Sequence, residues 1–349
     1  MTSASPRYLL CRPRGGLNDT LCQIERCWDY AERYGRTLIV DTSRSGLLLP
    51  CSEFFTPVAG DAIFSLSDHR LAGIDLDSMD CRPALLQGRT TAQVIPRRRR
   101  IRTADGTRAQ TSFDFSRDHA ETLLIHEDYG GSFASQKFLN RVRIADAVAT
   151  EIRAALAELG RVDAAIHLRN TDYKTPLDNF FGEVKPKLAG RRVLICCDDP
   201  ATIARVRQSL DGSEVVTATD IVDKGGQPLH NPRAYQEDAE RRRASVNSLI
   251  DLCALATAPE LYVVQLNFGA YSGFSELAVF LSQNPGVLNT LLGILPGATR
   301  PPAVVTRVQT KSPFRVLFRL TGWNPLFGKR LRRKLNKLRR RIRTAMIGR

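Results

Sequence analysis

A strand, a glycine-containing loop, a helix and a second strand follow one another within the first 41 residues, and no other feature of this 349-residue chain limits its fold as strongly. The apolar run Tyr8–Cys11 predicts a buried strand, and the loop Arg12–Asn18 after it contains two glycines. Spacings of three and four predict a helix with one apolar face, formed by Leu21, Ile24, Cys27, Trp28 and Ala31. Gly35 ends this helix, and Thr37–Asp41 predicts the second strand. Such a unit places its two strands parallel, with a right-handed crossover.

A second series of alternating strands and helices begins near Ile144. Helical patterns cover residues 144–159 and 237–256, and the apolar runs predict strands at 163–168, 193–197, 214–217 and 260–265. Strands that alternate with helices are typical of doubly wound parallel sheets. The sequence therefore predicts an α/β protein with two Rossmann-like domains, at residues 1–150 and 151–298, followed by a tail at 299–349.

The stretch 61–118 between the two series has little periodicity and contains the basic run RRRRIR at 97–102. We interpret this run as a solvated loop. The alternative is a basic patch on the side of the protein that binds an acceptor substrate.

The net charge of +15 is concentrated near the C-terminus. Residues 300–349 contain sixteen Lys and Arg and no acid, which leaves 35 basic against 36 acidic residues in the rest of the chain. A nearly neutral body argues against a nucleic-acid-binding core. It favours a separate anion-binding segment in the tail.

The eight cysteines include no C-x-x-C pair, and most lie in apolar runs. This usage indicates buried free thiols in a reducing compartment and argues against zinc. The first residues lack the pattern of a signal peptide, and the longest later apolar run, Gly286–Ala298, is interrupted and too short for a membrane span. We therefore expect a cytoplasmic protein.

Ligands of open parallel sheets bind beyond the carboxyl ends of the strands, so the residues after each strand are candidates for a binding site. After the first strand, Arg14, Gly15, Gly16 and Asn18 precede a helix N-terminus that can bind an anion, while Asp19 is a candidate N-cap. After another strand, His167 and Arg169 project to the same side. Arg169 suits a phosphate contact; a salt bridge to Asp172 is the structural alternative.

Two further segments carry carboxylates and hydroxyls. Asp198 and Asp199 follow a strand and precede Pro200; Asp199 reads as an N-cap, whereas Asp198 stays open between a metal or ribose ligand and a structural role. Asp251 lies in an apolar helical stretch and needs a partner, either a nucleotide or a structural hydrogen-bond donor. The segment Tyr271–Glu276 opens a helix whose N-terminus can face a diphosphate, through Ser272, Gly273, Phe274 and Ser275, with an ordinary N-cap as the alternative for Ser272.

These segments, at 12–19, 167–172, 196–200, 248–255 and 272–278, occur in the order and rough spacing of the α1,6-fucosyltransferase superfamily. The chain most resembles its rhizobial nodulation fucosyltransferase (NodZ) family, through the opening RYLLCRPRGGLNDTLCQIERCWDYAERYGRTLIVD, the segment PLHNP at 228–232 and the helix leading to ELYVV. The resemblance covers residues 7–290, with 60–160 poorly matched.

The resemblance implies a GT-B fold, in which two such domains face a cleft, and an inverting transfer that requires no metal. It implies that the C-terminal domain holds GDP-fucose and the N-terminal domain holds a glycan acceptor. Arg169 matches the family arginine that contacts the β-phosphate, and His167, Asp251 and Ser272 match positions lining the nucleotide site. Asn170 departs from the pattern, where a second basic residue is usual, and Lys174 is a displaced substitute.

Inversion requires a group that takes the proton of the acceptor hydroxyl. Asp172 and Asp178 follow the HLRNTD segment and are the candidates, with a solvated loop acid as the alternative reading. Three competing functions are a non-catalytic nucleotide-sugar-binding protein, a transferase using another GDP-sugar, and an NAD-dependent oxidoreductase. The last is disfavoured because no G-x-G-x-x-G follows a strand.

The tail from Lys311 to residue 347 combines aromatic residues with an amphipathic helical pattern whose polar face is Lys and Arg. This pattern favours binding to an anionic membrane surface over RNA binding or a plain solvated tail. It predicts a peripheral position on the inner face of the cytoplasmic membrane, which suits a lipid-linked or lipooligosaccharide acceptor.

Overall fold

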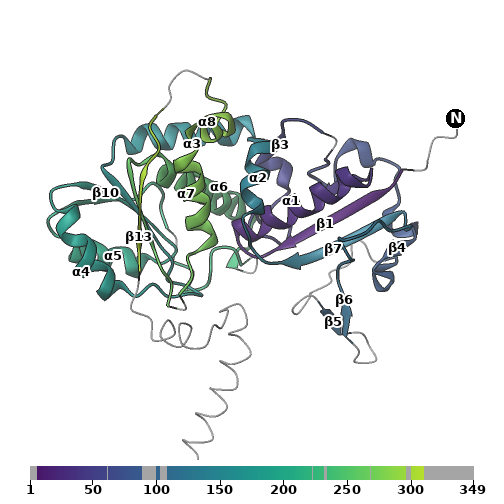
Figure 1. Ribbon diagram of the computed structural model, residues 1–349, viewed down its shortest axis with the longest axis horizontal. Coiled ribbons are helices and arrows are strands. Elements are labelled where there is room, and N and C mark those ends of the chain that lie inside the picture. Colours follow the sequence, from purple (N-terminus) through teal and green to yellow (C-terminus); the bar gives the residue numbers. More distant parts are fainter. Residues whose placement is uncertain are drawn as a thin grey trace, which may run out of the picture.

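The computed structural model describes residues 6–60, 62–88, 100–102, 108–221, 223–231, 234–267, 269–295 and 300–309. The side chains of 100–102, 108–110, 178 and 179 lie outside this description. The described chain forms two halves, each built around a parallel sheet, which lie next to each other along the long axis (Figure 1).

The sheet of the first half has the strand order β2-β1-β7-β4, and all its pairs are parallel. The strands are β1 (Tyr8–Arg14), β2 (Thr37–Val40), β4 (Cys81–Arg82) and β7 (Leu123–Tyr129). Tyr8 is in register with both Thr37 and Leu123. Helix α1 (Leu17–Arg33) connects β1 to β2 and packs on the sheet, and α2 (Ala134–Arg141) packs on α1.

The sheet of the second half has the order β11-β10-β9-β12-β13 and is also parallel. Its strands are β9 (Ala164–Leu168), β10 (Arg192–Cys197), β11 (Glu214–Val216), β12 (Glu260–Val264) and β13 (Val304–Val308). The helices of this part are α3 (Asp146–Leu159), α4 (Leu177–Leu188), α5 (Pro200–Ser209), α6 (Asp238–Thr257), α7 (Gly273–Gln283) and α8 (Pro285–Leu291).

Two small antiparallel pairs complete the described strands. One joins β3 (Phe55–Pro57) to β8 (Val142–Ile144), and the other joins β5 (Arg100–Arg102) to β6 (Arg108–Gln110). The end of the basic run at 97–102 is therefore a strand, where the sequence predicted a loop, because residues 108–110 supply backbone partners that periodicity does not reveal.

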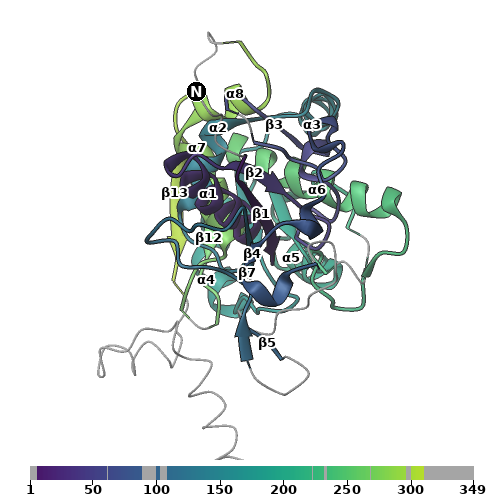
Figure 2. The same ribbon diagram turned by 90° about the vertical axis from the view of Figure 1, so that its right-hand side faces the viewer.

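One hydrophobic core runs through both halves. It contains Leu9 and Cys11 of β1, the apolar face of α1, and buried residues of α6, α7 and α8. Figure 2 shows α1 and α7 next to each other, and the two helices are in contact. The far faces of the two sheets are covered by separate clusters, one around Leu10 and Ile125 and the other around Ile166 and Ile195. Burial on both faces is expected of parallel strands.

Most predicted elements are present with shifted ends. Helix α1 begins at Leu17 instead of Asp19, with Gly16 as its N-cap, and Asp19 lies in its first turn without being the cap. Strand β7, the neighbour of β1, was not predicted, since its sequence LLIHEDY combines apolar and charged residues. Strand β13 extends the second sheet to residue 308, although the sequence predicts a tail at 299–349. The division at residue 150 stays a prediction and falls within α3.

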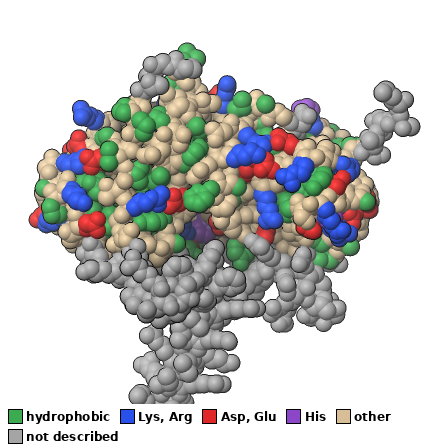
Figure 3. All heavy atoms as spheres, in the orientation of Figure 1, with side chains coloured by type: hydrophobic (Ala, Val, Ile, Leu, Met, Phe, Trp, Pro, Cys, Tyr) green, Lys and Arg blue, Asp and Glu red, His purple; other side chains and the backbone are tan. Residues whose placement is uncertain are grey.

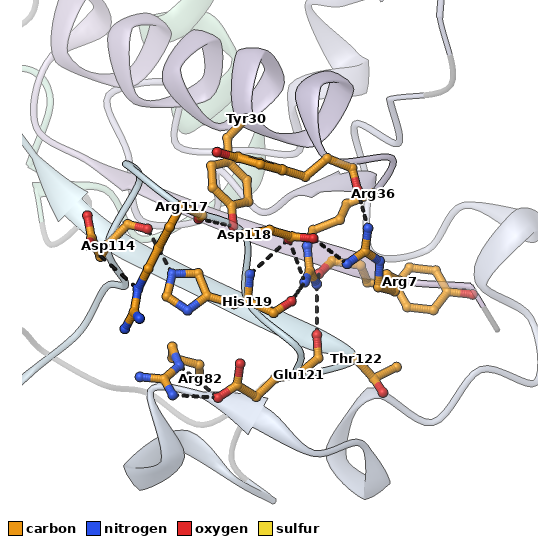
Figure 4. Close-up of polar contacts among 12 residues, drawn as sticks. Arg7, Tyr30, Arg36, Arg82, Asp114, Arg117, Asp118, His119, Glu121 and Thr122 are labelled. Atoms are coloured by element: carbon orange, nitrogen blue, oxygen red, sulfur yellow. Dashed lines mark hydrogen bonds and ion pairs between the residues drawn. The ribbon is translucent and has the colours of Figure 1, made fainter. Parts of the chain in front are cut away.

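A buried arginine fixes the edge of the first sheet that is remote from the carboxyl ends of its strands. The guanidinium of Arg36 donates to the carbonyl oxygens of Glu121 at 2.8 Å and of His119. Asp118 is 3.4 Å from the same group and also pairs with Arg7 (Figure 4). These bonds attach the segment before β7 to the starts of β1 and β2, and they serve the fold.

The surface of the body carries mixed charge. On the face drawn in Figure 3, Lys and Arg lie among Asp and Glu over both halves. Within the described ranges, none of the helices combines the length and the apolar character needed to cross a bilayer. The proposed membrane-binding segment 311–347 lies outside the described residues.

Candidate active site

A pocket of about 400 Å³ lies where the carboxyl ends of β1, β9, β10 and β12 meet. Both halves contribute to its wall, the first through the loop from β1 into α1 and the second through the residues that follow its strands. Eleven of the fourteen predicted site residues line it: Gly15, Gly16, Asn18, His167, Arg169, Asp172, Asp198, Asp251, Ser272, Gly273 and Phe274.

Two of the other three predicted residues, Arg14 and Ser275, lie outside this pocket. Arg14 lines a neighbouring hollow and pairs with Glu127. Ser275 is buried behind the pocket wall, where its hydroxyl is 2.7 Å from Nδ1 of His167. Asp178 belongs to α4, and its side chain lies outside the described residues.

Glycines allow the backbone to pack tightly around the loop before α1. Gly15 has a φ of +99°, and a Cβ there would lie 2.4 Å from Oδ2 of Asp19. Gly46 of the neighbouring loop packs on the same turn, and its Cβ would lie 2.8 Å from the carbonyl carbon of Gly16. Such a distance is far below van der Waals contact, so the observed loop conformation requires glycine at both positions.

Asn18 joins the two halves at the pocket wall. Its Oδ1 accepts a 2.6 Å hydrogen bond from the hydroxyl of Ser135, at the start of α2. A Cβ on Gly131 or on Gly273 would lie 2.6 Å from Nδ2 of Asn18. The N-termini of α1 and α7 are therefore held close together, and the dipoles of both helices direct partial positive charge toward the pocket.

His167 is neutral. Burial, and secondarily the charge of Arg169, lower its pKa to about 3. Its ring lies 5.0 Å from that of Phe274, and Ser275 bonds its Nδ1. A neutral imidazole held at Nδ1 presents Nε2 for a hydrogen bond to a ligand.

Arg169 and Asp172 form an ion pair inside the pocket, the structural alternative that the sequence had left open. Nε and one terminal nitrogen of Arg169 lie 2.9 and 2.8 Å from the same oxygen of Asp172. The ring of Tyr173 lies 5.4 Å from the guanidinium. The pair is partly exposed, so an incoming anion can compete with Asp172 for Arg169.

Asp198 fixes the loop after β9. One of its oxygens accepts a 2.6 Å bond from the backbone N–H of Asn170, and the other accepts from the hydroxyl of Thr171. Asp199 caps α5 as predicted, accepting from the N–H of Ala201 at 3.3 Å. The amide of Asn170 is directed to Thr202 and Asp199, so this departure from the family pattern serves the loop conformation.

Asp251 lines the pocket from α6. Its Oδ1 accepts a 3.1 Å hydrogen bond from the hydroxyl of Thr219, which supplies the partner that an acid in an apolar stretch requires. Burial nevertheless raises the pKa of Asp251 to about 7, because its effect is larger than the lowering caused by the hydrogen bond from Thr219. A carboxyl poised near neutrality changes its charge readily when a ligand binds.

A second hollow of about 310 Å³ adjoins the first, and both are lined by Gly15, Tyr129 and His230. Sequence reasoning missed Tyr129, His230 and Gly46 as pocket residues. His230 lies in the segment PLHNP that contributed to the resemblance, which was the one available signal. Tyr129 ends the unpredicted strand β7, and Gly46 lies in a loop without a motif.

Comparisons with known proteins support the fold through structure alone. No family model matches the sequence, and no curated protein matches it. The structure is similar to the fucosyltransferase NodZ from Bradyrhizobium, with a TM-score of 0.53, 18% identity, and coverage of 80% of this chain and 94% of that one. It is also similar to a NodZ α1,6-fucosyltransferase soaked with GDP-fucose, with a TM-score of 0.51, 18% identity, and 79% and 93% coverage. The chain therefore has the GT-B fold, as predicted.

Proposed function

We propose that this protein is an inverting glycosyltransferase that transfers fucose from GDP-fucose to a glycan acceptor. The observation that carries the proposal is the convergence of Arg169 and the N-termini of α1 and α7 on one pocket between the halves of a GT-B fold. This arrangement suits a ligand with a diphosphate, because it combines a guanidinium with two sets of backbone N–H groups. The NodZ structure soaked with GDP-fucose adds support at the level of the fold.

In this proposal the second half holds the nucleotide. Neutral His167 and the carboxyl of Asp251 supply an acceptor or donor for groups of the nucleoside, and Ser272 with Gly273, Phe274 and Ser275 forms the helix N-terminus that faces the diphosphate. Asp198 acts indirectly, because both of its oxygens hold the loop that carries Arg169.

Breaking the bond from C1 of the sugar to the diphosphate places negative charge on the leaving GDP. Groups that are already oriented toward this charge lower the barrier, and losing one costs about 3 kcal/mol. We assign this role to Arg169, to the Gly15–Asn18 turn and to the start of α7. These groups supply the positive charge that a metal ion supplies in other transferases, so we propose that no metal ion is required.

The acceptor hydroxyl attacks C1 on the face opposite the diphosphate, and its proton passes to a carboxylate. Asp172 and Asp178 are the proposed bases. Asp172 takes this role once the diphosphate has drawn Arg169 away, since the two residues are paired in the structure.

Calorimetric titration with GDP and GDP-fucose, in the presence of EDTA, tests the proposal. The wild type binds both nucleotides, and Arg169→Ala weakens binding at least tenfold. The exposed Arg143 on β8 provides a matched control, and Arg143→Ala leaves the affinity unchanged. Absence of GDP binding would refute the assignment. Binding of GDP-fucose without transfer of fucose to any acceptor would identify a nucleotide-sugar-binding protein instead.

We also propose that residues 311–347 bind an anionic membrane surface and bring the enzyme to a lipid-linked acceptor. Because β13 belongs to the second sheet, the truncated chain for this test ends after residue 309 and not near 298. The full chain should sediment with anionic vesicles, and the truncated chain should stay in the supernatant. Equal sedimentation of the two would exclude the tail as the anchor.

A further inference from the structure

His230 lies at the boundary between the two hollows of the candidate active site. It belongs to the chain between β11 and α6, and it lines both the pocket of about 400 Å³ and the hollow of about 310 Å³. Gly15, in the turn before α1, and Tyr129, at the end of β7, share this position. A side chain at this boundary can face a donor on one side and an acceptor on the other.

The loop that carries His230 is fixed on both sides of the pocket. The hydroxyl of buried Tyr235 donates a 2.8 Å hydrogen bond to the carbonyl oxygen of Leu229, the residue before His230. Toward the first half, Nδ1 of His230 lies 3.9 Å from the position of a Cβ on Gly16. The imidazole is therefore held against the Gly15–Asn18 turn, which the proposed function assigns to the leaving diphosphate.

The imidazole of His230 can accept a proton from a ligand. Burial, and next the charge of Arg169, lower the pKa of His230, so its ring is neutral at pH 7. The carboxylates of Asp172 and Asp198 are near enough to act in the opposite direction. Among the described residues, none forms a hydrogen bond with this ring. A neutral imidazole has one nitrogen that accepts a hydrogen bond or a proton and one that donates.

Binding of the donor changes the charges around His230 in one direction. Arg169 is paired with Asp172 in the structure, and in the proposed function it moves from this carboxylate to the diphosphate. The diphosphate then compensates the guanidinium, and the carboxylate of Asp172 is released. Both changes favour a proton on the imidazole, so His230 becomes a stronger base once the donor is bound. Four other charged groups line the two hollows and take no part in this exchange: Arg14, Asp19, Arg44 and Asp251.

We propose that His230 takes the proton of the attacking acceptor hydroxyl and passes a proton on to Asp172. The inference rests on the proposed function, and it adds the group that the hydroxyl meets before the carboxylate. As the acceptor oxygen bonds to C1 of fucose, the bond from C1 to the diphosphate breaks and its electron pair leaves with GDP. The hydroxyl proton moves to one ring nitrogen of His230, the other ring nitrogen gives its proton to Asp172, and the imidazole is neutral again.

Transfer of fucose from GDP-fucose to water tests the inference without a known acceptor, because water supplies the attacking hydroxyl. Release of GDP is followed for the wild type, His230→Gln and His230→Ala. The same two substitutions at His69, whose side chain is 92% exposed, are the matched controls. A positioned base contributes about 10²–10⁴-fold to a rate, so both His230 variants should lose about a hundredfold or more in kcat. Their KM for GDP-fucose and Kd for GDP should stay near those of the wild type, and the His69 variants should be unchanged.

Added imidazole provides a signature that a structural role would not give. It should restore part of the rate to His230→Ala, because the removed ring leaves room at the boundary of the two hollows, and it should not affect the His69 variants. A wild-type rate in His230→Gln would overturn the inference. So would a lowered kcat that imidazole does not restore, or a loss of GDP affinity as large as the loss of rate, because these results assign His230 to the turn or to the donor.

A second measurement does not depend on turnover. The chain has five histidines, so the ring nitrogens of His230 can be followed by ¹⁵N NMR of the full chain, with His230→Gln identifying its signals. GDP should raise the pKa of His230 and not that of His69, and Asp172→Asn should reduce this rise. A pKa of His230 that GDP leaves unchanged would overturn the inference, and this titration decides the matter where the wild type releases no GDP to water. Failure of the wild type to bind GDP is a separate result, which would refute the proposed function itself.

Discussion

Gly46→Ala should disturb the pocket, although Gly46 has no side chain that could contact a ligand. A Cβ at this position would lie 2.8 Å from the carbonyl carbon of Gly16, 2.9 Å from the oxygen of Gly15 and 2.9 Å from the nitrogen of Leu17. Normal carbon–carbon contact is about 3.5–4.0 Å, so one of the two loops must move by roughly 0.7 Å or more. All three neighbours are backbone atoms, and no side-chain rotation relieves the clash.

Overpacking of this kind costs about 1–3 kcal/mol of unfolding free energy. Because the displaced turn also leads into α1 at the pocket, we expect a several-fold loss of affinity for GDP in addition to the loss of stability. Gly182 in α4 is the matched control: nothing lies within 4 Å of its Cβ position, so Gly182→Ala should stabilise the protein by about 0.5–1 kcal/mol. Urea unfolding measures both variants. Equal stability of Gly46→Ala and the wild type, with unchanged GDP affinity, would refute the packing argument.

Three further variants test the charges and the cap. The folded pKa of Asp251 is about 7, whereas the ordinary pKa of the group is 3.8, so the folded state binds more protons between these values and loses stability as the pH rises through them. Asp251→Asn should therefore be more stable than the wild type at pH 8, by up to about 4 kcal/mol, with a much smaller difference at pH 4, as followed by urea unfolding at both pH values. Glu127→Gln should lower stability by about 3–5 kcal/mol, because it removes the buried carboxylate that pairs with buried Arg12; thermal unfolding at two salt concentrations checks this. Ser272 accepts from the N–H of Phe274, so Ser272→Ala should cost about 1 kcal/mol and weaken GDP binding, whereas a loss of stability alone would exclude a contact with the diphosphate.

The parts of the fold that the sequence predicts are those with local signals. The unit from Tyr8 to Val40 has a buried strand, a glycine turn, a regular apolar face and a terminating glycine, and each signal depends on neighbours within a few residues. The same holds for α6 and β12. Strands end where their side chains begin to line the pocket, so the rule for parallel sheets located most of the candidate site.

The parts that the sequence does not predict depend on distant partners. Strand β7 looks mixed because Leu123 and Ile125 face a core while Glu127 faces the arginines of β1, which the chain brings in from more than 110 positions away. From its sequence, β13 is indistinguishable from the basic tail that follows it, and only its pairing with β12 makes it a strand of the second sheet. Gly46 acquires its importance only from the turn at Gly15 and Gly16 that packs on it.

The continuous core has a consequence for how the pocket meets its ligand. The helices α1 and α7 pack in the same hydrophobic cluster, and Asn18 between Gly131 and Gly273 leaves no space for their N-termini to approach further. The donor groups at the pocket are therefore oriented before a ligand arrives, and in the proposed mechanism the charge that develops on the leaving group meets donors that need no rearrangement. In that mechanism the exception is Arg169, which has to exchange Asp172 for the diphosphate. Binding of the donor then releases the carboxylate that the proposed mechanism requires as a base, so proton removal from the acceptor becomes possible only after the sugar nucleotide is in place.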